Sequence, residues 1–237
     1  MTREGHEEAL GLLSVALDAA PDYAPALALA AWIHTLRVPQ HWAEPAEAGR
    51  AGLALARRAL AAGQDDAEVL AMSGYALGFL GHELERGRAA IEQAIAISPS
   101  SALGFSSSGW LHAYLGNHDE AIQRFRRALV LSPRDPLAFR SRAGLAFALL
   151  FSGHPEDALA EASRAQNEAP GFTPAHRVRV VALAGLGRLA EASAVVADLA
   201  ALVPGITIGY VLAETRFVRP EDRARLEEGL RAAGLPD

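Results

Sequence analysis

The sequence repeats itself about every 34 residues, and this repeat limits the possible folds more than any other feature. Pro99, Pro133, Pro170 and Pro204 follow one another at intervals of 34, 37 and 34 residues. Each is preceded by a small residue twelve positions earlier and by apolar residues eight and five positions earlier. The residues twelve positions before the prolines are Gly87, Ala121, Ala158 and Ala192. Those eight positions before are Ile91, Phe125, Ala162 and Val196, and those five positions before are Ala94, Ala128, Ala165 and Leu199. Spacings of four and three residues place each trio on one face of a helix, which the proline then ends.

A second helix is predicted in each period, because turn residues divide the repeat. Gly116, Gly153 and Gly187, in "LGN", "SGH" and "LGR", are expected to end the preceding helix with a positive φ. In "SPRDPLAF" we expect Asp135 to cap the next helix and Pro136 to be its first residue. Each period therefore predicts a helical hairpin, and the chain is predicted to be all-α.

Composition excludes several classes of function. The net charge of −6 and the pI near 5.8 argue against nucleic acid as a partner. All 22 basic residues are arginine, which removes the P-loop lysine and every lysine Schiff-base mechanism. Cysteine is absent, so disulfides, thiolate nucleophiles and cysteine zinc sites are excluded. No apolar run approaches 20 residues and no signal peptide is recognisable, so we expect a cytoplasmic protein that does not bind membranes.

The period and its small–large–small–proline pattern resemble the tetratricopeptide repeat (TPR) family. That resemblance implies an all-α fold in which helix–turn–helix repeats stack into a right-handed superhelical solenoid. It covers nearly all of residues 1–237 and implies a single solenoid domain. The expected parts are a half repeat at 1–21, a repeat with a long interhelix linker at 22–66, repeats at 67–101, 102–135, 136–172 and 173–206, and capping helices at 207–237.

The two ends of the sequence suggest a wider context. "GHEEALGLLSVALDAAP" reads as a second helix without its first, so we expect the chain to begin within a repeat. The stretches "IEQAIAISP", "GWLHAYLGNHDEAIQRFRRALVLSPRDP" and "EGLRAAGLPD" are similar to the C-terminal TPR region of bacterial class III adenylate/guanylate cyclases and related signalling proteins. This narrower resemblance implies a regulatory or scaffolding role in a larger bacterial signalling protein and carries no catalytic residue.

A recurring pair of large apolar residues forms the first candidate site. One pair occurs in each predicted first helix with a spacing of four residues: Trp32 with Leu36, Tyr75 with Phe79, Trp110 with Tyr114, and Phe147 with Phe151. The TPR resemblance places them on the concave side, where aromatic residues would anchor a helix or an extended peptide. The alternative is that they pack neighbouring first helices together.

Two arginines form the second candidate site. Arg140 and Arg177 fall on groove-facing positions of consecutive repeats, near Ser106 and Ser107. A guanidinium fork suits a carboxylate or phosphate, as in the clamp that some TPR proteins use on acidic tails. The lysine and asparagine positions of that clamp do not match here, so the arginines could instead be solvated or paired with a nearby carboxylate.

The histidines do not predict a metal site. His6, His82, His118 and His154 occur once per repeat at or after a turn, so equivalent atoms lie too far apart to share one ion. We expect them to serve as turn aromatics, and His34 and His112 to lie in the core. No catalytic motif is complete, because "GFSSSG" lacks the lysine or G-x-S-x-G spacing and "GHELERG" lacks a second histidine.

The sequence therefore predicts a non-catalytic scaffold, without cofactor or metal, that binds a protein or peptide partner in a concave groove. The alternative is a homodimerisation module that brings attached catalytic or DNA-binding domains together. A third hypothesis is a small-molecule sensor that uses the same groove.

Overall fold

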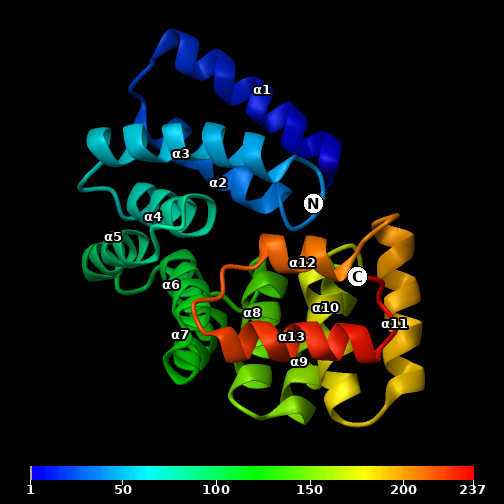
Figure 1. Ribbon diagram of the computed structural model, residues 1–237. Coiled ribbons are helices and arrows are strands. Elements are labelled where there is room, and N and C mark those ends of the chain that lie inside the picture. Colours follow the sequence, from blue (N-terminus) through cyan, green and yellow to red (C-terminus); the bar gives the residue numbers. More distant parts are fainter. Residues whose placement is uncertain (1) are drawn as a thin grey trace. The chain divides into compact units, whose positions relative to one another are not determined.

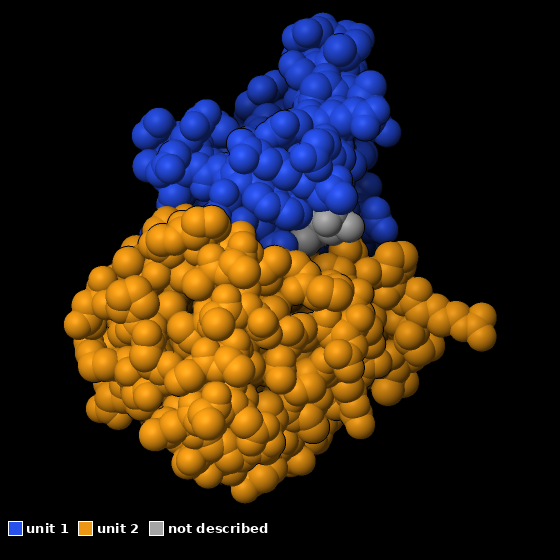
Figure 2. All heavy atoms as spheres, turned by 90° about the vertical axis from the view of Figure 1, so that its right-hand side faces the viewer, with its two compact units in different colours: residues 1–111 blue, residues 112–237 orange. Residues whose placement is uncertain are grey.

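A computed structural model describes residues 2–237 of the chain (Figure 1). Within these residues there are thirteen helices and no strand, so the predicted all-α fold class is confirmed. The chain divides into two compact units, residues 1–111 and 112–237, which Figure 2 shows in different colours.

Helical hairpins make up both units. Unit 1 contains α1 (Arg3–Ala19), α2 (Ala24–Arg37), α3 (Pro45–Ala62), α4 (Ala67–Gly81), α5 (Leu84–Ile97) and most of α6 (Ala102–Leu115). Unit 2 contains the end of α6, α7 (His118–Leu131), α8 (Ala138–Phe151), α9 (Pro155–Glu168), α10 (Thr173–Gly185), α11 (Leu189–Leu202), α12 (Ile208–Glu214) and α13 (Pro220–Ala232). The even-numbered helices α2 to α10 are the first helices of the hairpins, and α3 to α11 are the second helices.

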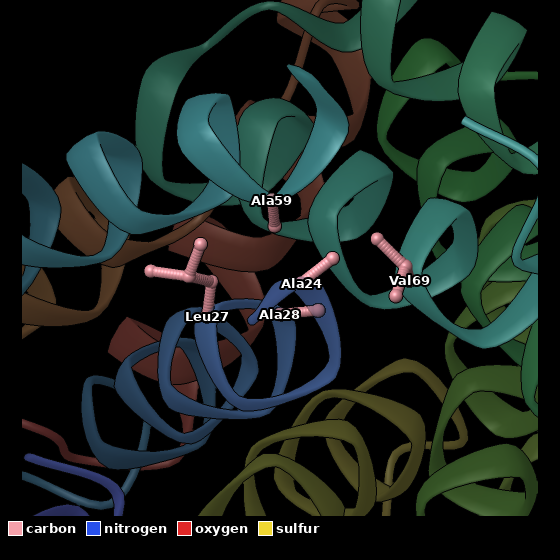
Figure 3. Packing of buried hydrophobic residues seen from close by; sticks show 5 residues of the cluster. All are labelled: Ala24, Leu27, Ala28, Ala59 and Val69. Carbon is pink, nitrogen blue, oxygen red and sulfur yellow. The ribbon is translucent and has the colours of Figure 1, made fainter. Parts of the chain in front are cut away.

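The residues of the repeat pattern form the contacts within the hairpins. On α7, for example, the predicted face of Ala121, Phe125 and Ala128 is buried. The pattern departs at α11, where Val195 is buried and Val196 is only half-buried. In unit 1, Figure 3 shows Ala24, Leu27 and Ala28 of α2 packed against Ala59 of α3 and Val69 of α4. Small side chains dominate these contacts, so neighbouring helices pack closely.

The turns follow the predicted chemistry, with one exception. Gly116, Gly153 and Gly187 have φ of 82°, 86° and 74°, as expected of helix-ending glycines. The predicted start of α8 at Pro136 is wrong, because the helix begins at Ala138. The Asp135 carboxylate accepts a hydrogen bond from the Leu137 N–H at 2.8 Å, and this local turn delays the helix by two residues.

One hairpin is held at unusually short distance by glycine. A Cβ added to Gly87 of α5 would lie 2.4 Å from the carbonyl oxygen of Gly74 on α4. Both backbones therefore approach more closely than any side chain permits.

None of the helices formed by the described residues is both long and apolar enough to cross a membrane.

Candidate partner-binding face

The predicted binding residues are buried rather than open to solvent. All eleven lie on first helices, and their exposed fractions run from 2% for Phe79 to 9% for Phe151. They are Trp32 and Leu36 on α2, Tyr75 and Phe79 on α4, Ser106, Trp110 and Tyr114 on α6, Arg140, Phe147 and Phe151 on α8, and Arg177 on α10.

The members that belong to unit 1 lie within packed helices. The rings of Tyr75 and Phe79 are stacked, with centroids 5.7 Å apart and planes 6° apart. Trp32 and Trp110 are 7% and 6% exposed. These side chains are therefore buried within unit 1.

The members that belong to unit 2 form an aromatic cluster. Phe147 lies 4.6 Å from Phe151 and 6.1 Å from Tyr114, measured between ring centroids. A fourth ring comes from Phe217, between α12 and α13, which stacks on Phe147 at 5.5 Å and meets Phe151 edge-on at 5.3 Å. The chain's own C-terminal region therefore covers the predicted aromatic surface of α8.

Phe217 belongs to a stretch, residues 214–219, that we call the C-terminal segment. Thr215 and Arg219 have extended backbone angles, with φ of −88° and −86° and ψ of 136° and 122°. The Val218 N–H donates a hydrogen bond of 3.0 Å to the Tyr114 carbonyl oxygen at the end of α6. Beside it the Arg219 side chain lies directly over Gly116, where a Cβ would have no room. After Glu214, the last residue of α12, the segment thus crosses the first helices of unit 2 without helical structure.

An ion pair joins the start of this segment to α10. The Arg177 guanidinium lies 2.8 Å from the Glu214 carboxylate, and the two side chains are only 9% and 2% exposed. Burial raises the pKa of the Glu214 carboxyl, against the opposing influence of Arg177 and of a hydrogen bond from Tyr210. Arg177 therefore pairs with a carboxylate of its own chain, as the second reading of the predicted clamp allowed.

A second buried polar pair involves Asp222, which comes after the C-terminal segment in the chain. The Nε2 atom of His118, the first residue of α7, lies 2.8 Å from the Asp222 carboxylate of α13. The two side chains are 5% and 7% exposed, and the His118 ring stacks on Phe151 at 5.6 Å. His118 is thus a buried turn aromatic that also anchors α13. Among the described residues there is no group of three or more acidic or histidine side chains that could hold a metal ion.

Sequence reasoning missed the four residues that cover this face: Glu214, Phe217, Val218 and Asp222. Asp222 lies in the predicted capping region and is 5% exposed. The available signal was the stretch "TRFVRP", which places two apolar residues between arginines. Since the residue before a proline avoids the helical region, this stretch could have been predicted to be extended.

The comparisons with known proteins concern the fold. No protein-family model and no curated protein matches the sequence. Several solved structures match the architecture. YrrB, a TPR protein with an unusual peptide-binding site, aligns over 75% of this chain and 90% of its own, with 23% identity and a TM-score of 0.50. The fold is that of TPR proteins.

Two further structures have the same TPR fold. PilW, a widely conserved type IV pilus biogenesis factor, aligns over 78% of this chain and 86% of its own, with 19% identity and a TM-score of 0.60. A chain of the APC/C hetero-tetramer Cut9–Hcn1 aligns over 95% of this chain, with 13% identity and a TM-score of 0.68. This chain spans only 39% of that longer one.

Proposed function

We propose that the protein is a non-catalytic interaction module that binds a protein or peptide partner on the first-helix face of its hairpins. The observation that carries this proposal is the C-terminal segment, which lies against the end of α6, α8 and α10 in unit 2. It contacts that face through an ion pair, stacked rings and a backbone hydrogen bond. A peptide in the same conformation could make each of these contacts.

Two further considerations support a binding role. YrrB, which shares the fold, is a TPR protein with a peptide-binding site. The face also combines a buried guanidinium with aromatic rings, and both kinds of group are enriched at the energetic centres of interfaces. We propose that the remaining predicted residues, from Trp32 to Trp110, belong to the first-helix face of unit 1.

The wider context is also a proposal. The similarity of "GWLHAYLGNHDEAIQRFRRALVLSPRDP" to the TPR regions of bacterial cyclases supports a regulatory role within a larger cytoplasmic signalling protein. The acidic net charge supports a protein partner rather than nucleic acid.

Selection from a random peptide library on the full chain tests the binding role. Selected peptides should bind with Kd values of about 1–100 μM by calorimetry, since an extended segment makes a small interface. Hydrogen exchange should then show new protection in α8 and α10. Protection confined to the second helices α7, α9 and α11, or no binding peptide at all, would contradict the proposal.

A homodimerisation module is the second candidate, and exposed residues on α1 favour it. Leu12 and Val15 are 67% and 68% exposed and lie three residues apart, so they share one face of the helix. Apolar surface of this kind is typical of an interface. Light scattering over a concentration series should show a dimer that Leu12→Glu disrupts. A monomer at every concentration would exclude this candidate.

A further inference from the structure

The manner in which the C-terminal segment lies on unit 2 defines the partner more closely. We propose that residues 214–218 are an internal occupant of the binding face, and that the partner replacing them is an extended segment with an acidic residue three positions before an aromatic one. This inference rests on the proposed function and specifies its ligand.

The acidic position is set by Arg177. Its side chain is 9% exposed and lies 2.8 Å from the Glu214 carboxylate. If Glu214 left without replacement, the buried Arg177 guanidinium would lose the counter-charge of this carboxylate, which is unfavourable. A competing segment must therefore place a carboxylate at the same point, where a guanidinium can bind both of its oxygens.

The aromatic position is set by Phe147 and Phe151. They are 6% and 9% exposed, and Phe217 lies stacked on one and edge-on to the other. Both geometries are favoured between aromatic rings, and an aliphatic side chain would satisfy neither. Phe217 is itself only half-buried, so its outer edge is accessible to a competing ring.

The position after the aromatic residue carries no side-chain requirement. Val218 is 56% exposed, and its backbone N–H donates a hydrogen bond to the Tyr114 carbonyl oxygen. Any residue except proline can make this hydrogen bond. The interval from Glu214, the last residue of α12, to Phe217 also fits the scaffold. Three residues span at most about 10 Å, and adjacent packed helices lie about 8–10 Å apart. One anchor thus falls on α10 and the next on α8.

The segment can leave without unfolding the hairpins. Its residues 215–219 are the five non-helical residues between α12 and α13, and two of them, Val218 and Arg219, are exposed. Leu226 and Leu230 are 4% and 0% exposed, so α13 has its own buried contacts. Short stretches with few buried contacts open locally at much lower free energy than the whole fold.

A labelled peptide with the sequence of residues 212–222, LAETRFVRPED, is the probe, and the full chain is the receptor. Phe217→Ala removes the aromatic anchor of the internal segment. Since competition lowers the apparent affinity by the fraction of open sites, the peptide should bind this variant about tenfold or more tightly than the wild type. Val218→Ala is the matched control, because it shortens an exposed neighbour and keeps the backbone N–H, and it should behave as the wild type does.

Two changes to the peptide test its chemistry. Replacing the phenylalanine of the peptide by leucine, or its first glutamate by glutamine, should each abolish most of the binding to the Phe217→Ala chain. Circular dichroism checks that this chain folds. If it does not, Glu214→Gln, which keeps the volume of the acidic anchor, provides the released receptor and should bind the unmodified peptide in its place.

The outcomes separate this inference from the proposed function. Equal binding of the peptide to the wild type and both released variants would overturn the internal occupant. Undiminished binding of the leucine peptide would overturn the acidic–aromatic ligand. In either case, library peptides that protect α8 and α10 would leave the proposed function standing, whereas a complete lack of peptide binding to all receptors would remove both.

Discussion

The buried pair of Arg177 and Glu214 makes the sharpest energetic prediction. Removing one partner of a buried ion pair costs about 3–5 kcal/mol, because the other charge stays in a low-dielectric site without compensation. With side chains 9% and 2% exposed and a separation of 2.8 Å, this pair belongs to that class. We therefore expect Arg177→Ala and Glu214→Ala each to lower the free energy of unfolding by about 3–5 kcal/mol.

The double variant distinguishes pairing from simple loss of packing. Because neither charge is then left alone, it should be destabilised by about 1–3 kcal/mol less than the sum of the single changes. The assay is urea unfolding at pH 7, followed by the helical circular dichroism signal. Additive single effects would refute the reasoning, because they would mean that the two side chains do not depend on each other.

The pH dependence of the same pair has a definite sign. Burial raises the pKa of Glu214 above its usual 4.5, so the folded chain binds this proton more readily than the unfolded chain does. The contribution of Glu214 to stability is therefore fully present below pH 4.5 and decreases as the pH rises through the raised pKa. Glu214→Gln should lack this decrease, so its stability relative to wild type should increase between pH 4.5 and 7. A constant difference would contradict the prediction.

Two other predictions concern the hairpins. Gly87→Ala should lower the free energy of unfolding by about 1–3 kcal/mol, since the new methyl must move from 2.4 Å to at least 3.0 Å from a backbone oxygen. Gly11→Ala, within α1 and with no atom within 4 Å of the new methyl, should instead stabilise by about 0.5–1 kcal/mol; thermal melts showing equal effects would contradict both. Burial is the main cause that lowers the pKa of His176 below 6.5, so stability should fall as the pH decreases through and below 6.5. His176→Gln should flatten that fall in urea titrations at pH 5–8, and an unchanged slope would contradict the assignment.

Much of the fold could be predicted because its determinants are local and repeated. The Ala121–Phe125–Ala128 spacing and the glycine at 116 each act within one hairpin, and the repeat presents them several times. Local reasoning failed at Pro136, where a turn closed by the Asp135 side chain competes with helix initiation.

The candidate site was harder to predict because its pairings are not local. His118 and Asp222 are separated by 104 residues, and nothing in the repeat relates α7 to a helix outside it. The aromatic pairs on the first helices were found, but their spacing is the same whether a partner or the chain itself covers them. Only the three-dimensional course of residues 214–219 distinguishes the two.

The C-terminal segment covers the aromatic cluster of unit 2 although it is polar. Its exchange for a partner explains this polar character. An aromatic face left open to water would promote aggregation, and an apolar strip would bury it most simply. The segment instead contains a buried ion pair, which adds less to stability than well-packed apolar residues of similar volume. A cover with a charged anchor can, however, be exchanged for a competing chain that carries the same charge, and it resists chains that do not. A segment that served stability alone would have no need for Glu214, and replacing both Arg177 and Glu214 by leucine should then stabilise the fold while abolishing selection for an acidic peptide.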